Sequence, residues 1–130
     1  MLKTYLAVML GGALGTGLRL ALSTWLANRY GETFPIGTLV VNISGCFLIG
    51  VFAALTGSDG PLLTSPLVRI FVMIGILGGF TTFSSFSLQT LSLWQDGEWL
   101  RGGLNALFSL AFCLIAVWLG QVTANLLTHR

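Results

Sequence analysis

The stretch IFVMIGILGGFTTFSSFSLQTLSLW, Ile70–Trp94, decides the class of fold because it is long, largely apolar and free of charge. Roughly 20 consecutive apolar residues in a helix cross the hydrocarbon core of a bilayer. The stretch also contains GGFTTFSSFS, Gly78–Ser87, in which hydroxyl side chains are set among phenyl rings. The length and apolar character predict a membrane-spanning helix. The hydroxyl side chains raise the question of why such a helix carries so many polar groups.

The composition of the whole chain agrees with a membrane protein. Mean hydropathy is +0.89, and 55% of the 130 residues are hydrophobic while only 8% are charged. A soluble domain of this size would not tolerate such a surface. Charged residues are absent between Glu32 and Asp59, between Arg69 and Asp96, and between Arg101 and His129. Each interval is long enough for one helix to cross the bilayer.

We therefore predict an all-α integral membrane protein, a single domain over residues 1–130 with four transmembrane helices. The expected spans are about Thr4–Ala27, Ile36–Leu55, Pro66–Leu93 and Trp99–Leu126. The first span is not expected to be a secretory signal, because of its length and its internal Arg19. Irregular backbone cannot face lipid, so each span should be helical wherever it contacts the bilayer.

Charge gives almost no preference for one orientation in the membrane. Four spans place Lys3, Arg69 and Arg130 on one side, and Arg29 and Arg101 on the other. Three against two is too small a difference for the positive-inside rule to fix a topology. Either cellular context overcomes a weak signal, or the chain inserts both ways and forms an antiparallel homodimer. We favour the dimer, because four small helices can hardly enclose a polar path alone.

Small residues predict close helix packing. Gly11 and Gly15 form one GxxxG motif, and Gly75 and Gly79 form another. Such motifs let two helix backbones approach closely. Packing within one chain and packing between two chains are both open.

The sequence does not supply the residues of an enzyme. Cys46 and Cys113 lie in mid-span and His129 is the single histidine, so they form neither a disulfide framework nor a metal site. The four predicted spans contain no carboxylate. We therefore expect no catalytic activity.

Polar side chains within the spans carry the functional argument, because polar groups at membrane depth are costly and usually face a partner or a pathway. They are Arg19, Thr38, Asn42, Ser44, Thr81, Thr82, Ser84, Ser85, Ser87, Gln89, Asn105, Ser109 and Gln121. Any single hydroxyl can instead bond back to a carbonyl one turn earlier. Asn42 can serve as a contact between helices, and Arg19 can extend towards the interface as a scaffold residue.

The run Gly78–Ser87 is harder to explain by packing alone. Two glycines followed by β-branched threonines are a poor helix interior, so we expect the third helix to break at Gly78–Thr82. A break frees carbonyls, which are tolerated at membrane depth only where protein or a watery cavity satisfies them. Such carbonyls are hard ligands for a small cation.

Beyond the break, Phe83 and Phe86 are three residues apart and share a helix face. The edge of a phenyl ring is positive, so rings turned edge-on can meet an anion. Rings turned to lipid would be ordinary membrane-facing residues, and the pattern alone leaves that alternative open.

At these residues the chain resembles the Fluc family of fluoride channels, also called CrcB proteins. The resemblance runs from end to end. It is carried by Gly11-Gly12…Gly15…Arg19, by Gly37-Thr38-Leu39…Asn42, and by the signature Gly78–Ser87.

The resemblance implies a dual-topology antiparallel homodimer in a bacterial plasma membrane, with two pores that pass fluoride passively and no nucleic-acid partner. The rings of Phe83 and Phe86 would face fluoride as a "Phe box". The other pore residues would be Asn42, Ser109, Thr38, Ser84, Ser85 and, near a pore mouth, Arg19. Carbonyls of Gly78 and Thr81 from both subunits would hold a structural sodium ion. Phe80 is expected to be a packing residue.

The sequence departs from the family pattern at two positions. Gln89 stands where many members have glutamate, and an amide can form hydrogen bonds but cannot ionise. Cys113 stands where serine is frequent, and a thiol is a weaker donor.

Two other functions remain as alternatives. A non-transporting scaffold subunit would explain the glycines but not the rings. A small multidrug-type antiporter would need a carboxylate in the membrane, which the spans lack.

Overall fold

The computed structural model describes residues 1–58 and 60–128, and this part of the chain is helical with no strand. Its elements are α1 (Leu2–Tyr30), α2 (Ile36–Thr56), α3 (Pro66–Arg69), η1 (Ile70–Leu77), α4 (Gly78–Phe80), α5 (Phe83–Gln95) and α6 (Trp99–Thr128). They make up four helical runs long and apolar enough to cross a membrane, with α3 to α5 forming the third. The prediction of an all-α chain with four such helices is confirmed.

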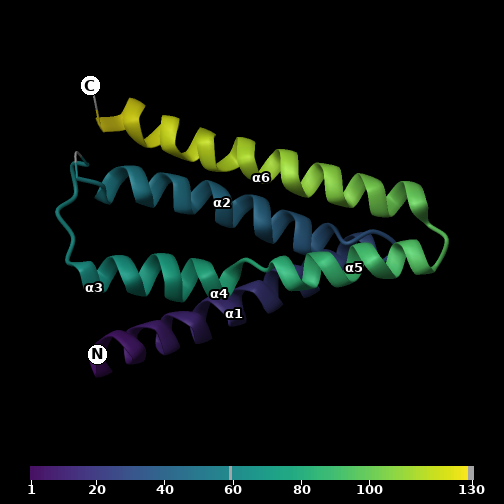
Figure 1. Cartoon of the computed structure of the whole chain (residues 1–130), viewed down its shortest axis with the longest axis horizontal. Coiled ribbons are helices and arrows are strands. Elements are labelled where there is room, and N and C mark those ends of the chain that lie inside the picture. The colour runs from purple at the N-terminus through teal and green to yellow at the C-terminus, as the bar shows by residue number, and fades with distance from the viewer. Residues whose placement is uncertain (59, 129–130) are drawn as a thin grey trace.

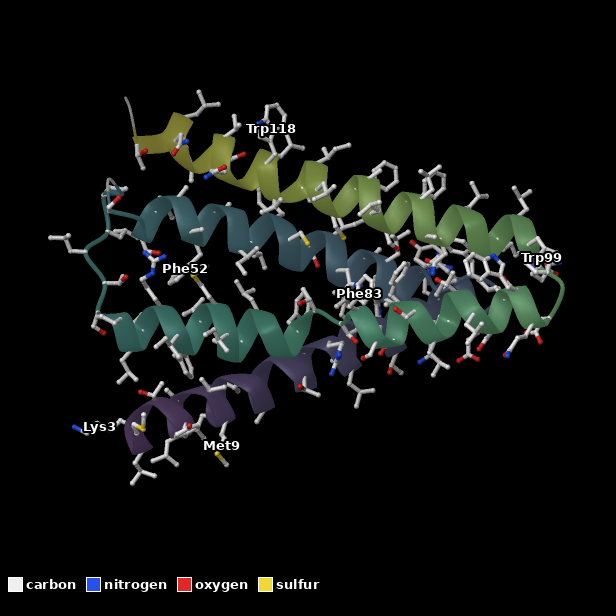
Figure 2. All side chains as sticks on the ribbon, viewed as in Figure 1. Lys3, Met9, Phe52, Phe83, Trp99 and Trp118 are labelled. Carbon is white, nitrogen blue, oxygen red and sulfur yellow. The ribbon has the colours of Figure 1, made fainter. Side chains whose placement is uncertain are left out.

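The four runs pass back and forth along one long axis (Figure 1). The beginning of α1 and the end of α6 lie at the same end of the molecule, as four passes require. α2 packs mainly against α6, and α1 packs mainly against η1 and α4. Trp118 points away from the other helices in Figure 2 and is 61% exposed, which agrees with a lipid contact.

The two GxxxG motifs pack against each other within one chain. A Cβ built on Gly11 would lie 2.7 Å from Phe71 O and 2.9 Å from Gly75 Cα. A Cβ built on Gly79 would lie 2.7 Å from Gly12 O. Side chains at these positions would collide with backbone, so the glycines are needed for α1 to reach the third run.

The third run begins as an ordinary capped α-helix, α3, and continues as a wider π-helix, η1. Ser65 caps α3, where its side chain accepts a hydrogen bond from Val68 N. The following segment, η1, is π-helical over Ile70–Leu77. Extended π-helical segments are rare, and short ones are frequent at functional sites. The sequence pattern did not predict this one.

Two residues then leave the helical conformation. Thr81 has φ −82° and ψ 157°, and Thr82 has φ −153° and ψ 117°. Gly78 remains helical at φ −65° and ψ −36°, and α4 extends to Phe80. Within the range Gly78–Thr82 the non-helical residues are the two threonines, whereas Gly79 serves the close approach of α1.

Candidate functional site

Asn42 pairs with the backbone of Thr82 through two hydrogen bonds. Asn42 Nδ2 donates to Thr82 O at 3.0 Å, and Thr82 N donates to Asn42 Oδ1 at 2.8 Å. Both residues are buried. One carboxamide on α2 therefore satisfies both polar groups of an extended residue, while Nδ2 keeps a second N–H for another partner.

The side chain of Thr82 begins the next helix. Its Oγ1 accepts a hydrogen bond from Ser85 N at 3.2 Å, which is the N-cap contact that helix α5 needs. The same oxygen lies 3.1 Å from Ser85 Oγ and 3.2 Å from Ser84 Oγ. Three hydroxyl groups thus gather beside the two non-helical residues.

The interruption also removes the helical donors of several carbonyls, among them those of Gly78 and Thr81. In a continuous helix, the N–H groups of Thr82 and Ser85 would bond to residues four positions earlier. Thr82 N donates to Asn42 instead, and Ser85 N donates to Thr82 Oγ1. The carbonyl oxygens of Gly78 and Thr81 are therefore available to another partner. Carbonyl oxygens of this kind suit a small hard cation.

The rings of Phe83 and Phe86 lie side by side at the start of α5. Their centroids are 5.2 Å apart and their planes are tilted by 54°. Phe83 lies near the middle of the molecule's length in Figure 2, and it is 79% exposed in the single chain. Its ring therefore remains open to a partner or to a passing ion.

A groove of about 830 Å³ lies between α1, the start of α2 and α5. Five of its polar lining residues are Arg19, Thr38, Thr82, Ser85 and Gln89. The structure thus brings three of the predicted site residues into one groove. The other predicted side chains, which do not line the groove, are Asn42, Ser84, Phe83, Phe86 and Ser109.

Three buried polar atoms have no hydrogen-bond partner among the described residues. They are Thr64 Oγ1, outside the proposed site, and Ser109 Oγ and Gln89 Oε1. Buried polar groups nearly always have a partner, so an unpaired one calls for an explanation such as water or an ion. Ser109 on α6 was predicted to lie in the pore, and Gln89 was singled out as a departure from the family pattern.

Sequence reasoning noted Asn105 as polar but gave it no role. Its side chain is 2% exposed, and Nδ2 donates to Thr90 Oγ1 at 2.8 Å. Thr90 Oγ1 donates in turn to Phe86 O at 2.8 Å. An asparagine in an apolar run was the available signal, but its pairing with Thr90 depends on the packing of α5 against α6.

The sequence of this chain matches a known protein family. The family description "CrcB-like protein, Camphor Resistance (CrcB)" matches residues 6–121. The chain belongs to this family. The predicted resemblance is confirmed.

Proteins with the name "Fluoride-specific ion channel FluC" are among the relatives. The one from Opitutus terrae is 58% identical over 95% of this chain and 93% of its own length. Those from Rhodospirillum rubrum and Paramagnetospirillum magneticum are 55% and 54% identical, each over 97% of this chain and 98% of its own length. These relatives are named as channels and not as enzymes, in agreement with the prediction of no catalytic activity. Together with the four apolar helices, they indicate a multi-pass membrane protein.

Proposed function

We propose that this chain forms a fluoride channel that exports fluoride passively across the bacterial inner membrane and so lowers its toxicity. The observation that carries the proposal is the interruption at Thr81–Thr82, which Asn42 satisfies and which the rings of Phe83 and Phe86 follow directly. The choice of fluoride rests on the relatives, which are named fluoride-specific channels.

The chain offers an anion several donors, and two carboxylates, Glu32 and Asp96, also line the groove. The second N–H of Asn42 and the unpartnered hydroxyl of Ser109 can replace water around fluoride. The other hydroxyls on the proposed path are those of Thr38, Ser84 and Ser85. The positive ring edges of Phe83 and Phe86 attract the ion without a full charge that would trap it. Arg19 lies in the same groove and would offset part of the negative charge of the two carboxylates on the way to the path.

The proposed assembly is an antiparallel, dual-topology homodimer with two pores. Two features support a second copy. Phe83 and Gly78 are exposed in the single chain, although both belong to the proposed site. The apolar side chains buried within the described part of the chain are few: Leu26, Val41, Leu77, Phe80, Ala116 and Ala124. A partner would complete the enclosure of the path.

We further propose that the interruption is a break of the third helix in the middle of the membrane and that it holds a structural sodium ion. The carbonyls of Gly78 and Thr81 fit this role because neither has its usual helical donor. Backbone of this kind is tolerated at membrane depth only where a cavity, a protein group or an ion satisfies it. The same carbonyls from both subunits would contribute ligands, and the ion would link the two copies.

Electrode-monitored efflux from liposomes that contain the purified chain tests the proposal. We expect fast fluoride release and negligible chloride release. Phe83→Ile should lower fluoride release about ten-fold or more, because a favourable ring contact is lost. Phe112→Ile is the matched control, since Phe112 is an exposed ring on α6 outside the proposed site.

The alternatives predict different results. A scaffold subunit would give well-folded dimers without fluoride flux, which would reject the channel. A multidrug-type antiporter would couple a cationic substrate to protons through a carboxylate in the membrane. Glu32, Asp96 and Glu98 lie outside the helices, and Asp59 lies outside the described residues.

A further inference from the structure

Thr90 and Asn105 form a buried polar contact between α5 and α6 that the proposed permeation path does not itself use. Thr90 is 4% exposed and Asn105 is 2% exposed. Asn105 Nδ2 donates to Thr90 Oγ1, and Thr90 Oγ1 donates to Phe86 O, each at 2.8 Å. These two bonds, which we call the relay, connect the side chain of Asn105 on α6 to the backbone carbonyl of Phe86 on α5.

The direction of both bonds in the relay is fixed by chemistry. A hydroxyl group carries one proton. Thr90 gives that proton to the Phe86 carbonyl, so its oxygen must accept from Asn105, and an Nδ2 group can only donate. In a low-dielectric interior such consecutive bonds strengthen one another and make the structure more rigid.

The relay acts where α5 most needs support. The helix begins at Phe83, directly after two extended residues, so no preceding helical turn holds its first residues in place. Phe86 lies in that first turn, and its ring is 5.2 Å from that of Phe83. Thr90 lies one turn further on. Through the relay, α6 restrains the rotation of α5 at the turn that presents the rings.

We propose that Thr90 and Asn105 are positioning residues that set the orientation of the Phe86 ring. The consequence for permeation rests on the proposed function, because it assumes that the ring faces the ion. The positioning itself does not rest on it. Thr90→Ser should preserve the relay, since it keeps the hydroxyl, whereas Thr90→Val removes it with little change in shape.

A measurement that needs no transport tests the positioning. Phe86 is replaced by 4-fluorophenylalanine in the full-length chain, and ¹⁹F NMR reports the environment of the ring. We expect Thr90→Val and Asn105→Leu to shift or broaden the resonance and Thr90→Ser to leave it in place. Thr123→Val is the control, because the Thr123 hydroxyl bonds back to Leu119 O on an exposed surface. An unchanged resonance in both Thr90→Val and Asn105→Leu would overturn the proposal.

Fluoride efflux per dimer tests the consequence. We expect Thr90→Val and Asn105→Leu each to lower it roughly five-fold, as expected for the loss of one hydrogen bond, and the double variant to lower it no further. In a Phe86→Ile background, Thr90→Val should have no additional effect. Asn125→Leu, at an exposed site on α6, should leave the flux unchanged.

The outcomes separate the two proposals. Absence of fluoride flux in the unmodified chain rejects the proposed function and leaves the NMR result to decide the positioning. A lower dimer yield with an unchanged flux per dimer and an unchanged resonance would make the relay a packing contact only, and would overturn the positioning. Thr90→Ala, which adds no bulk, gives the same comparison if Thr90→Val does not assemble.

Discussion

At the scale of single residues, Asn42 satisfies the backbone at the point where the third helical run departs from helical geometry. Its carboxamide donates to one backbone group of Thr82 and accepts from the other, at 3.0 and 2.8 Å. A carboxamide carries its donor and its acceptor on two separate atoms of one planar group, so it can pair with the N–H and the C=O of one residue at the same time. Because the site is buried, water cannot readily replace the pair.

We predict that Asn42→Leu destabilises the folded chain by about 2–6 kcal/mol, since two buried backbone groups each lose a partner at about 1–3 kcal/mol. Unfolding in detergent, followed by circular dichroism or tryptophan fluorescence, measures the change. Asn125→Leu, an exposed replacement of the same kind, should stay within about 0.5 kcal/mol of the unmodified chain. Equal stability of the two variants would show that the pair contributes nothing.

At the scale of elements, α1 can pack against the third run only because glycines remove side chains from the contact. A Cβ on Gly15 would lie 2.8 Å from Phe80 N and closer still to Ile76 O, whereas a Cβ on Gly17 would meet nothing within 4 Å. Backbone cannot move aside as a flexible side chain can. The two glycines, two residues apart on one helix, therefore form a matched pair for experiment.

We predict that Gly15→Ala destabilises the chain by about 1–3 kcal/mol through overpacking. Gly17→Ala should have no cost and can stabilise α1 by up to about 1 kcal/mol, because alanine is the better helix former. The measurement is the unfolding midpoint of both variants in the same detergent. If both variants are equally stable, close approach of α1 is not what Gly15 provides.

The beginning of α5 supports a second prediction at this scale. Thr82→Val removes the oxygen that caps Ser85 N and should cost about 1 kcal/mol, whereas Thr82→Ser retains it. Hydrogen exchange of the Phe83–Ser85 amides measures local opening of this turn. Faster exchange is expected in Thr82→Val alone. Equal exchange in both variants would mean that the cap is supplied by another group.

Hydropathy and charge were sufficient to predict the helices, and the Gly-Gly-Phe-Thr-Thr sequence indicated a break, but its exact position within Gly78–Thr82 could not be predicted. Three of the four runs follow from long intervals without charge, and the first follows from its apolar length despite Arg19. The glycines were a plausible place for a break, yet Gly78 and Gly79 are helical, and the extended Thr82 is paired with Asn42, 40 residues away. The pairing of Thr90 with Asn105 could not be predicted either, because it also joins side chains on two different helices. Contacts between helices depend on how each helix is rotated about its axis and how deep it lies in the membrane. Neither can be read from a single sequence.

At the scale of the whole molecule, the weak charge bias becomes a testable property. Additional lysines on one side should fix one orientation, and an antiparallel dimer requires both. Thr33→Lys with Gln95→Lys adds charge at one end of the bundle. Leu2→Lys with Leu63→Lys adds charge at the other, and Leu63 is 99% exposed, so little packing is lost there.

We predict that neither doubly substituted chain alone gives fluoride release in cells or liposomes. Co-expression of the two chains should give release like that of the unmodified chain. The reason is that each variant supplies one orientation and only the mixture supplies both. The measurement is fluoride efflux after purification of each variant and of the mixture. Full activity of either variant by itself would exclude an obligatory antiparallel dimer.

The Asn42–Thr82 pair also dictates an order of events during synthesis. The carboxamide leaves the ribosome 40 residues before the peptide unit that it will satisfy. At about 5–20 residues per second, α2 waits roughly 2–8 s for that partner. During this interval the asparagine must use water, lipid headgroups or the insertion machinery in its place. The pair can form only after Thr82 has been synthesised, so α2 reaches its final hydrogen bonding later than its own synthesis.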